Sequence, residues 1–362
     1  MQNATKRLFG LQFLGLITAV IFLTAGTAFS QDWSNSAPKG IRKKCADDLR
    51  AQPSSIEILS QRYNSKHLAN TTVGEENEGH VKRPMSRIDA SVVVSKFLSA
   101  RFGEKNVERY YNDADANSND VWEVLFHTPD KRSHIVQVKN DQSIAGKTNY
   151  LDVEVTSPIM YDQGDYDLYD DILTELQRHS FQADSVAGGL HYHIGFDNYE
   201  SAEVAVLILV YDLIHEELFK IIDVSPERAT YAKRFNPALI EQIQAVANSF
   251  TRGERQHARW IIGLATDSNI SEGRNHGLNV TNLGENKLKT VEFRIANSTL
   301  NRKIRHSLRD FFKKLVLAVR NKDSKVLNLA IEAQKSKTKL PLEAIFQALN
   351  LNYDDFLEAF RF

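Results

Sequence analysis

The chain has 362 residues, which is enough for one large domain or two small ones. Its composition, 42% hydrophobic and 25% charged, is typical of soluble globular proteins. A formal net charge of only −1 excludes an acidic tail and gives no sign of a polyanion-binding surface, so we expect no nucleic-acid partner. The single cysteine, Cys45, cannot form an internal disulfide, and stability must therefore come from the core.

The N-terminus has the pattern of an export signal. Basic residues at positions 6–7 precede an apolar stretch over 8–25, and the small residues Ala28 and Ser30 stand where a signal peptidase prefers them. We expect residues 1–30 to be a signal peptide that is removed after Ser30. The alternative is an uncleaved membrane anchor, because the apolar run is almost long enough to span a bilayer. Both readings place the domain outside the cytoplasm, periplasmic or secreted, with the membrane contacted only through this segment.

The next part of the chain divides into a linker and the start of a domain. Residues 31–68 are polar and lack a sustained period, which predicts a linker with one short helix. The stretch over 86–103 predicts a helix that begins after Ser86 as its N-cap and ends at a glycine. Alternating patterns over 120–127 and 132–141, joined by the turn TPDK, predict a β-hairpin.

The remaining elements alternate between strands and helices. A strand is predicted within 149–160 that must stop at Pro158, and further strands over 188–196 and 287–298. Helices are predicted over 165–179, 200–222 and 301–321. We expect residues 69–321 to form the catalytic domain and residues 322–362 to form a helical extension that packs on it. The order lacks a regular βαβ rhythm and contains a hairpin, which predicts an α+β fold with a mostly antiparallel sheet and helices packed on one side.

Several polar pairs share one spacing within the predicted strands. Residues two apart in a strand point to the same face, so the stretch GGLHYHIGF (188–196) sets His191 and His193 side by side. The stretch TVEFRIA does the same for Glu292 and Arg294. In VGEENEG the pair is Glu76 and Glu78, and in DVEVTSP a single Glu154 lies opposite two valines.

Each of these positions has a simpler explanation when taken alone. A polar residue in an alternating strand can face solvent, and two histidines on one face can be a hydrogen-bonded pair at a sheet end. Together they indicate a sheet whose polar face lines a site. Carboxylates and imidazole can hold Mg²⁺ or Mn²⁺, and an arginine on the same face can neutralise a phosphoryl group during its transfer.

Common catalytic motifs are missing from the sequence. The chain has no G-x-x-x-x-G-K-[ST] loop and no kinase-like glycine loop, so any nucleotide would have to be held through metals. The absence of H-E-x-x-H and G-x-S-x-G removes the commonest zinc-protease and serine-hydrolase hypotheses.

Five short motifs in a fixed order give the chain a family resemblance. They are G-x-E-x-E (Gly74, Glu76, Glu78), D-x-S (Asp141, Ser143), E-x-x-S-P (Glu154, Ser157, Pro158), G-L-H-x-H-I-G (residues 189–195) and T-x-E-F-R (residues 290–294). Over roughly residues 70–320 the sequence resembles the amidoligase family, carboxylate–amine ligases of the glutamine synthetase and γ-glutamylcysteine synthetase superfamily. It departs from the family at Asn77, where an apolar strand residue is usual.

The resemblance implies a funnel-like curved sheet with helices on its outer side, and ATP with two or three Mg²⁺ or Mn²⁺ ions on its concave face. The implied reaction phosphorylates the carboxylate of an amino acid or peptide to an acyl phosphate, which an amine then attacks. The matching positions imply these roles: metal ligands Glu76, Glu78, Glu154, His191 and Glu292; nucleotide contacts His193 and Arg294; catalytic residues Glu292 and Arg294; substrate contacts Asp141, Ser143 and Arg274.

Export conflicts with this implied activity. ATP is scarce outside the cytoplasm, so an exported ligase would lack its energy source. The alternatives are an exported metal-dependent hydrolase, or a nucleotide- or peptide-binding protein on the same scaffold. The oligomeric state and the identities of the carboxylate and the amine stay open.

Overall fold

The computed structural model describes residues 53–112, 121–141, 148–251, 275–283 and 287–361. Ser54–Phe362 form one compact unit. The predicted signal peptide lies outside the described residues, and so do two of the predicted substrate contacts, Ser143 and Arg274.

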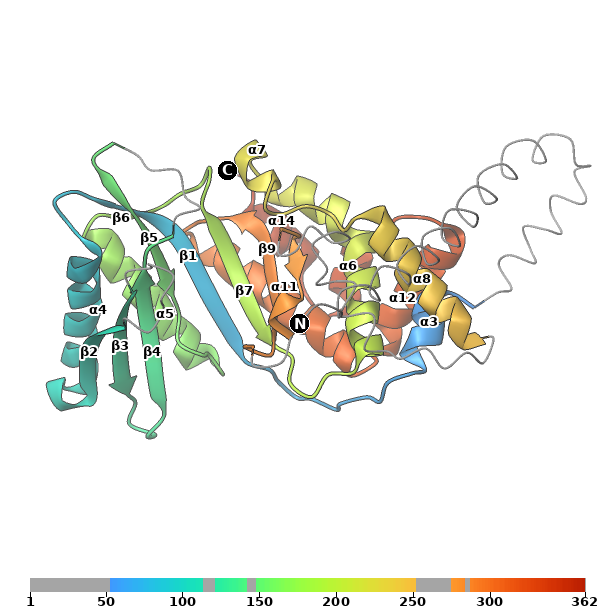
Figure 1. Cartoon of the computed structure of the whole chain (residues 1–362), viewed down its shortest axis with the longest axis horizontal. Helices are drawn as coiled ribbons and strands as arrows, with labels where there is room; N and C mark the ends of the chain where they lie inside the picture. The colour runs from blue at the N-terminus through green and yellow to red at the C-terminus, as the bar shows by residue number, and fades with distance from the viewer. Residues whose placement is uncertain (1–52, 113–120, 142–147, 252–274, 284–286, 362) are drawn as a thin grey trace, which may run out of the picture. The chain divides into compact units, whose positions relative to one another are not determined.

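A single large sheet organises the compact unit (Figure 1). Its strands in the described part of the chain are β1 (Val73–Lys82), β2 (Val107–Asn112), β3 (Val121–His127), β4 (Ser133–Lys139), β5 (Tyr150–Thr156), β6 (Phe181–Ala183), β7 (Gly189–Gly195), β8 (Leu278–Asn279) and β9 (Thr290–Asn297). Their spatial order is β2-β3-β4-β5-β1-β7-β9-β8, with β6 beside β1. All of these strand pairs are antiparallel, which confirms the α+β class and the antiparallel sheet. The sheet is neither closed nor strongly curled, so the expected funnel shape is not confirmed.

The two faces of the sheet differ in chemistry, as strand alternation requires. On β9 the apolar set Val291, Phe293 and Ile295 is fully buried, and Phe293 stacks on Phe312 of a covering helix with ring centroids 4.2 Å apart. On β7 the corresponding buried residue is Tyr192, whose hydroxyl donates to a carbonyl of the same helix. The alternate positions of these strands carry the polar residues on the opposite face.

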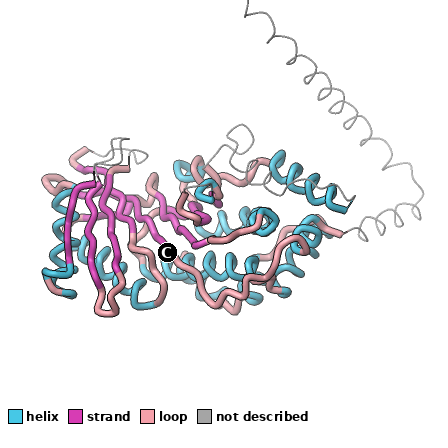
Figure 2. Tube along the Cα trace, turned by 60° about the horizontal axis from the view of Figure 1, so that its bottom comes forward, coloured by secondary structure: helices cyan, strands magenta, loops and turns pink. Residues whose placement is uncertain are grey.

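Helices cover the apolar face of the sheet, whose strands lie side by side in one layer (Figure 2). Helix α4 (Arg87–Phe102) packs on β2, β3 and β4, while α5 (Gln163–Arg178) packs on α4 and β6. Helix α11 (Arg302–Arg320) packs on β7, and the buried helix α6 (Ser201–Ile222) packs on α11.

The predicted start and end of α4 are confirmed. The Ser86 hydroxyl oxygen accepts a hydrogen bond from the Asp89 amide, and the Asp89 carboxylate in turn accepts one from the Ser86 amide. The helix stops at Gly103, whose φ of 90° lies in a region that side chains other than glycine rarely adopt. The hairpin of β3 and β4 is confirmed as well.

The remaining helices complete the compact unit. They are α3 (Ser55–Ser60), α7 (Pro226–Ala229), α8 (Pro237–Thr251), α12 (Ser324–Ser336), α13 (Leu342–Ala348) and α14 (Tyr353–Ala359), with 3-10 turns at Glu104–Asn106 and Thr281–Leu283. Helix α3 lies within residues 31–68 and packs on α6, α8 and α12, with Ile56 and Leu59 fully buried. In the described part of the chain, no helix has the length and apolar character needed to cross a bilayer.

Candidate functional site

The polar face of the sheet forms a cavity of about 400 Å³. Strands β1, β4, β5, β7, β8 and β9 all contribute side chains to its lining. The lining includes every predicted site residue that the structure describes: Glu76, Glu78, Asp141, Glu154, His191, His193, Glu292 and Arg294.

The register of the strands explains why residues far apart in sequence meet here. Glu78 pairs with Glu154 across β1 and β5, and Glu76 pairs with His191 across β1 and β7. On the other side of β7, His193 pairs with Glu292 of β9. Because paired residues in adjacent strands project to the same face, these six side chains form one continuous polar row.

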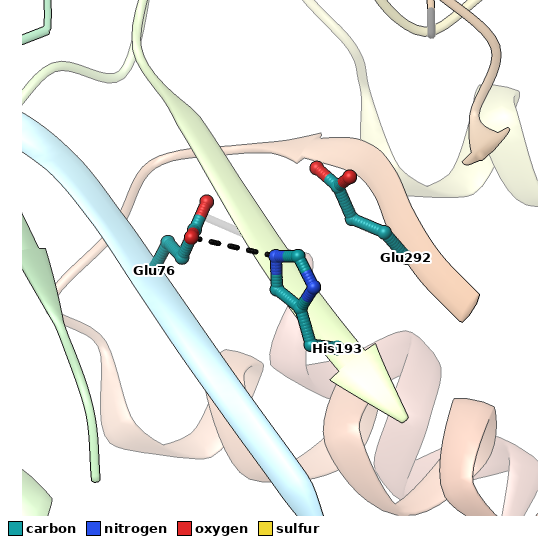
Figure 3. A group of neighbouring side chains, drawn as sticks. All are labelled: Glu76, His193 and Glu292. Carbon is teal, nitrogen blue, oxygen red and sulfur yellow. Dashed lines mark ion pairs between the residues drawn. The ribbon is translucent and has the colours of Figure 1, made fainter. Parts of the chain in front are cut away.

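One group of potential metal ligands lies on the central strands (Figure 3). Glu76, His193 and Glu292 each offer a ligand atom, and the three atoms lie within 4.8 Å of one another. His193 Nε2 is 3.4 Å from Glu76 Oε1. Glu292 is oriented by two amides, since Asn279 Nδ2 donates to its Oε2 at 2.7 Å and Asn282 Nδ2 at 3.3 Å.

A second group consists of Glu78, Asp141 and Glu154, whose ligand atoms also lie within 4.8 Å of one another. The backbone amide of Gly189 donates to Glu78 Oε2 at 2.5 Å, which fixes one end of this group. A lysine lies between the two groups: Lys139 Nζ is 2.8 Å from Glu154 Oε1 and 3.8 Å from Glu76 Oε1. Its ammonium therefore contacts one carboxylate of each group.

In the second group, burial and mutual repulsion raise the pKa of the carboxylates. Burial, the charge of Glu76 and the nearby Asp141 raise the pKa of Glu154 to about 8. Burial, together with Asp141 and Glu154, also raises the pKa of Glu78 well above its usual value, although Arg228 opposes the shift.

In the first group the pKa of the carboxylates is lowered instead, because the neighbouring histidine, His193, is positively charged when protonated. Burial opposes ionisation of Glu76, but the charge of His193 and hydrogen bonds from both histidines hold its pKa well below the usual value. Burial likewise disfavours a charged His193, but Glu76 and Glu292 raise its pKa to about 9. For Glu292, burial is outweighed by Arg294 and the two histidines, and its pKa is lowered.

The two histidines differ in their surroundings. His193 faces the carboxylates of the first group, and its Nδ1 lies 3.1 Å from the Thr290 hydroxyl. Burial, Arg294 and Arg228 lower the pKa of His191 to about 4. Its Nδ1 is 3.1 Å from Glu76 Oε2, and its Nε2 is 2.5 Å from Arg228 Nη2. The structure thus groups His193, and not His191, with the potential metal ligands.

Arg294 lies beside Glu292, with Nη1 3.2 Å from Glu292 Oε1. It is 7% exposed, and its Nε has no hydrogen-bond partner among the described residues. An arginine with a free donor on the wall of a polar cavity can bind an anionic oxygen.

The residues of this face that the sequence analysis did not predict include Lys139, Arg228, Asn279 and Asn282. Lys139 is the last residue of β4 and stands two residues before Asp141 in the sequence, and that spacing could have suggested it. The two asparagines stand in a two-residue strand and a turn that are too short to show a period. Arg228 comes from a four-residue helix, and no sequence pattern connects it with the sheet.

The donor set fits a hard divalent cation. Each group is rich in carboxylate oxygens, with a single imidazole nitrogen in the first, as suits Mg²⁺ or Mn²⁺. The described cavity residues include no thiolate. The buried carboxylates with raised pKa values are groups that a cation would ionise and stabilise.

No curated protein matches the chain. A family model described as "Putative amidoligase enzyme" matches residues 87–315, which is more than half of the chain. The match contains Asp141, Glu154, both histidines, Glu292 and Arg294, while β1 with Glu76 and Glu78 precedes it. The chain therefore belongs to this amidoligase family.

Proposed function

We propose that this protein is an ATP- and Mg²⁺-dependent carboxylate–amine ligase that makes an amide through an acyl phosphate. The observation that carries the proposal is the pair of ligand groups on one polar face, with Arg294 beside them in the same cavity. Membership of an amidoligase family supports a carbon–nitrogen ligase over other enzymes that use hard cations.

Each part of the polar face has a role in this proposal. Glu76, His193 and Glu292 would hold one cation, and the group of Glu78, Asp141 and Glu154 the other. Bound Mg²⁺ would supply neutralising charge to the triphosphate. Arg294 would donate to the γ-phosphoryl oxygens as their charge redistributes during transfer.

The chemistry balances in two steps. An oxygen of the substrate carboxylate attacks the γ-phosphorus, the bond to ADP breaks, and an acyl phosphate forms. The amine nitrogen then attacks the acyl carbon, phosphate leaves with that oxygen, and the amine loses a proton. Asp141 stands at the cavity next to the segment that contains Ser143, and we propose both, with Arg274, as contacts of the carboxylate and amine substrates. The substrates would be amino acids or peptides.

The proposal is tested by ADP release from the purified chain with Mg²⁺ and a panel of amino acids and amines. A productive pair should increase ADP release, and ¹⁸O placed in the substrate carboxylate should appear in the released phosphate. Amide-bond cleavage that depends on the metal but not on ATP would instead support an exported hydrolase, the alternative that the N-terminal segment motivates.

A further inference from the structure

Arg228 enters the polar face from outside the sheet. It lies on α7, it is 1% exposed, and its Nη2 donates to the backbone carbonyl of Arg294 at 3.0 Å. The same nitrogen is 2.5 Å from His191 Nε2, and Nη1 is 3.7 Å from Glu78 Oε2. One guanidinium therefore contacts β1, β7 and β9 at once.

The short helix α7 is anchored to the ends of these strands. The Ser225 hydroxyl caps the helix by accepting from the Arg228 amide at 3.1 Å, and it also donates to the carbonyl of Val186 just before β7. The Ser225 amide donates to Asn297 Oδ1 at the end of β9. These contacts fix the helix over the point where Arg228 enters.

The strand beneath Arg228 has no room for a side chain. A Cβ atom on Gly189 would overlap with the guanidinium of Arg228 and with His191 Nε2. The close approach of guanidinium, backbone and imidazole therefore depends on glycine at this position.

Hydrogen-bonding rules then determine the state of His191. A guanidinium can only donate, so His191 Nε2 must accept the bond from Arg228 and carries no hydrogen. Glu78 Oε1 is also near Nε2, but at the longer distance of 3.3 Å. Nδ1 carries the hydrogen of the neutral ring and points to Glu76 Oε2, 3.1 Å away. Neither ring nitrogen of His191 has a free lone pair to offer to a cation.

We infer that Arg228 is a positioning residue, which holds His191 as the Nδ1–H tautomer so that His191 orients Glu76 and His193 is the imidazole that faces the cation. Metal-ligating carboxylates in proteins are commonly held by such outer partners. The inference deepens the proposed metal site and rests on it for the role of Glu76. The tautomer itself is a property of the metal-free protein.

The tautomer is tested first, by ¹⁵N NMR of the histidine rings in the metal-free full chain. His191, assigned by comparison with His191→Asn, should show a protonated Nδ1 and an unprotonated Nε2. Arg228→Met should lose this selection, and Gly189→Ala should lose it too because its Cβ displaces the guanidinium. Arg228→Lys keeps a cationic donor and should retain the Nδ1–H tautomer. A protonated Nε2 in the unsubstituted chain, or an unchanged spectrum in both disrupting variants, would overturn the inference.

The consequence for the cation is tested with Mn²⁺ alone. Loss of an outer partner typically costs roughly 10- to 100-fold in metal affinity, and we expect a loss of this size in Arg228→Met. The matched control is Arg309→Met, because Arg309 is also 1% exposed but stacks on Tyr166 on the helical side, 3.7 Å from the ring centroid. Its affinity should be unchanged.

Two failures are distinguishable in this experiment. If the unsubstituted chain does not bind Mn²⁺, the proposed function is contradicted. If the unsubstituted chain binds and Arg228→Met binds equally well, the positioning role alone is contradicted. Should Arg228→Met not fold, Gly189→Ala replaces it as the disrupting variant, and Arg228→Lys is the variant expected to retain the affinity.

Discussion

At the scale of single residues, the clustering of carboxylates on the polar face disfavours their ionised forms in the metal-free protein. Glu78 and Glu154 lie close together with Asp141 in a buried position, and burial and their neighbours' charges raise the pKa of both. Lys139 offsets part of this repulsion through its contact with Glu154. Groups that are unfavourable when ionised alone are favourable once a cation joins them, so their clustering indicates a site that is complete only with a ligand.

Replacing Glu154 with glutamine tests this directly through pH. The folded-state pKa of Glu154 is about 8, above its usual 4.5, so its contribution to stability is full below pH 4.5 and is lost as the pH rises through 8. Glutamine cannot ionise and avoids this loss. Without metal, we expect the difference in melting temperature between Glu154→Gln and the unsubstituted protein to shift in favour of Glu154→Gln by roughly a few degrees as the pH rises from 5 to 9. Saturating Mn²⁺ should reverse the order; a constant difference across this pH range would contradict the account.

A second residue-scale prediction concerns Glu292, which should be essential to function but not to folding. Glu292→Gln keeps the shape of the side chain and removes one ligand charge, so Mn²⁺ affinity should fall by at least about tenfold, as losses at metal sites do. Arg294 and the two histidines lower the pKa of Glu292, so its charge contributes to the stability of the fold, and the melting temperature without metal should fall by no more than roughly a few degrees. The control is Glu123→Gln, because Glu123 lies on the same face and accepts from Gln137 and Asn112, but belongs to neither ligand group. A sharp loss of metal-free stability in Glu292→Gln would show that the residue is structural.

At the scale of elements, strand β1 is held by polar contacts on both of its faces. Its site-facing residues lie between β5 and β7, while Glu75 on the helical side is fully buried and 2.5 Å from Arg305 Nε of α11. Arg305 also reaches Asp170 of α5 at 2.7 Å. Asn77, the departure from the family pattern, accepts from Ser298 on this side. These contacts attach β1 to α5 and α11 and thereby fix the face on which Glu76 and Glu78 project.

Removing the arginine of this network should strongly destabilise the fold. Arg305→Met leaves buried carboxylates without their partner, a change that costs about 3–5 kcal/mol of the free energy of unfolding. Arg302→Met is the matched control on the same helix, because Arg302 is 54% exposed although it also contacts Asp170. An exposed ion pair contributes about 0–1 kcal/mol, so the control should be nearly neutral. Urea unfolding measures both, and equal losses would contradict the assignment of β1 anchoring to Arg305.

Strands were predicted best from the sequence where polar and apolar residues alternate over many positions. The strands that carry the histidines, Glu154 and Glu292 show a clear period of two, and their polar members do meet on one face. Strands β6 and β8 have three and two residues, too few to show a period. Glu75 and Asn77 interrupt the apolar side of β1, and only the opposing Arg305 and Ser298, more than 200 residues away, make them compatible with burial. The curvature of the sheet depends on twist and packing summed over many strands, which local patterns do not encode.

At the scale of the whole molecule, the C-terminal helices belong to the same core as the sheet. Phe311 of α11 stacks on Phe346 of α13 at 4.7 Å, and Leu342 and Phe356 are buried beside it. The family match ends at residue 315, within α11, so these helices extend the core beyond the matched part of the chain. They pack on α3, α6 and α11, and α11 in turn packs on β7, one of the strands that carry the site.

The N-terminal segment gives a prediction about the mature protein. Residues 1–30 have the basic, apolar and small-residue pattern of a cleaved signal. N-terminal sequencing of the protein exported by its host should therefore begin near Gln31. Recovery of Met1 on a membrane-bound form would support the anchor instead.

We propose that the polar face binds divalent cations and, through them, a nucleotide. The most direct test is calorimetric titration of the purified chain with Mn²⁺, followed by ATP. We predict two Mn²⁺ ions per chain, one for each ligand group, and ATP binding that requires the metal. ATP binding of equal strength with and without Mn²⁺, or no binding of either, would contradict the account.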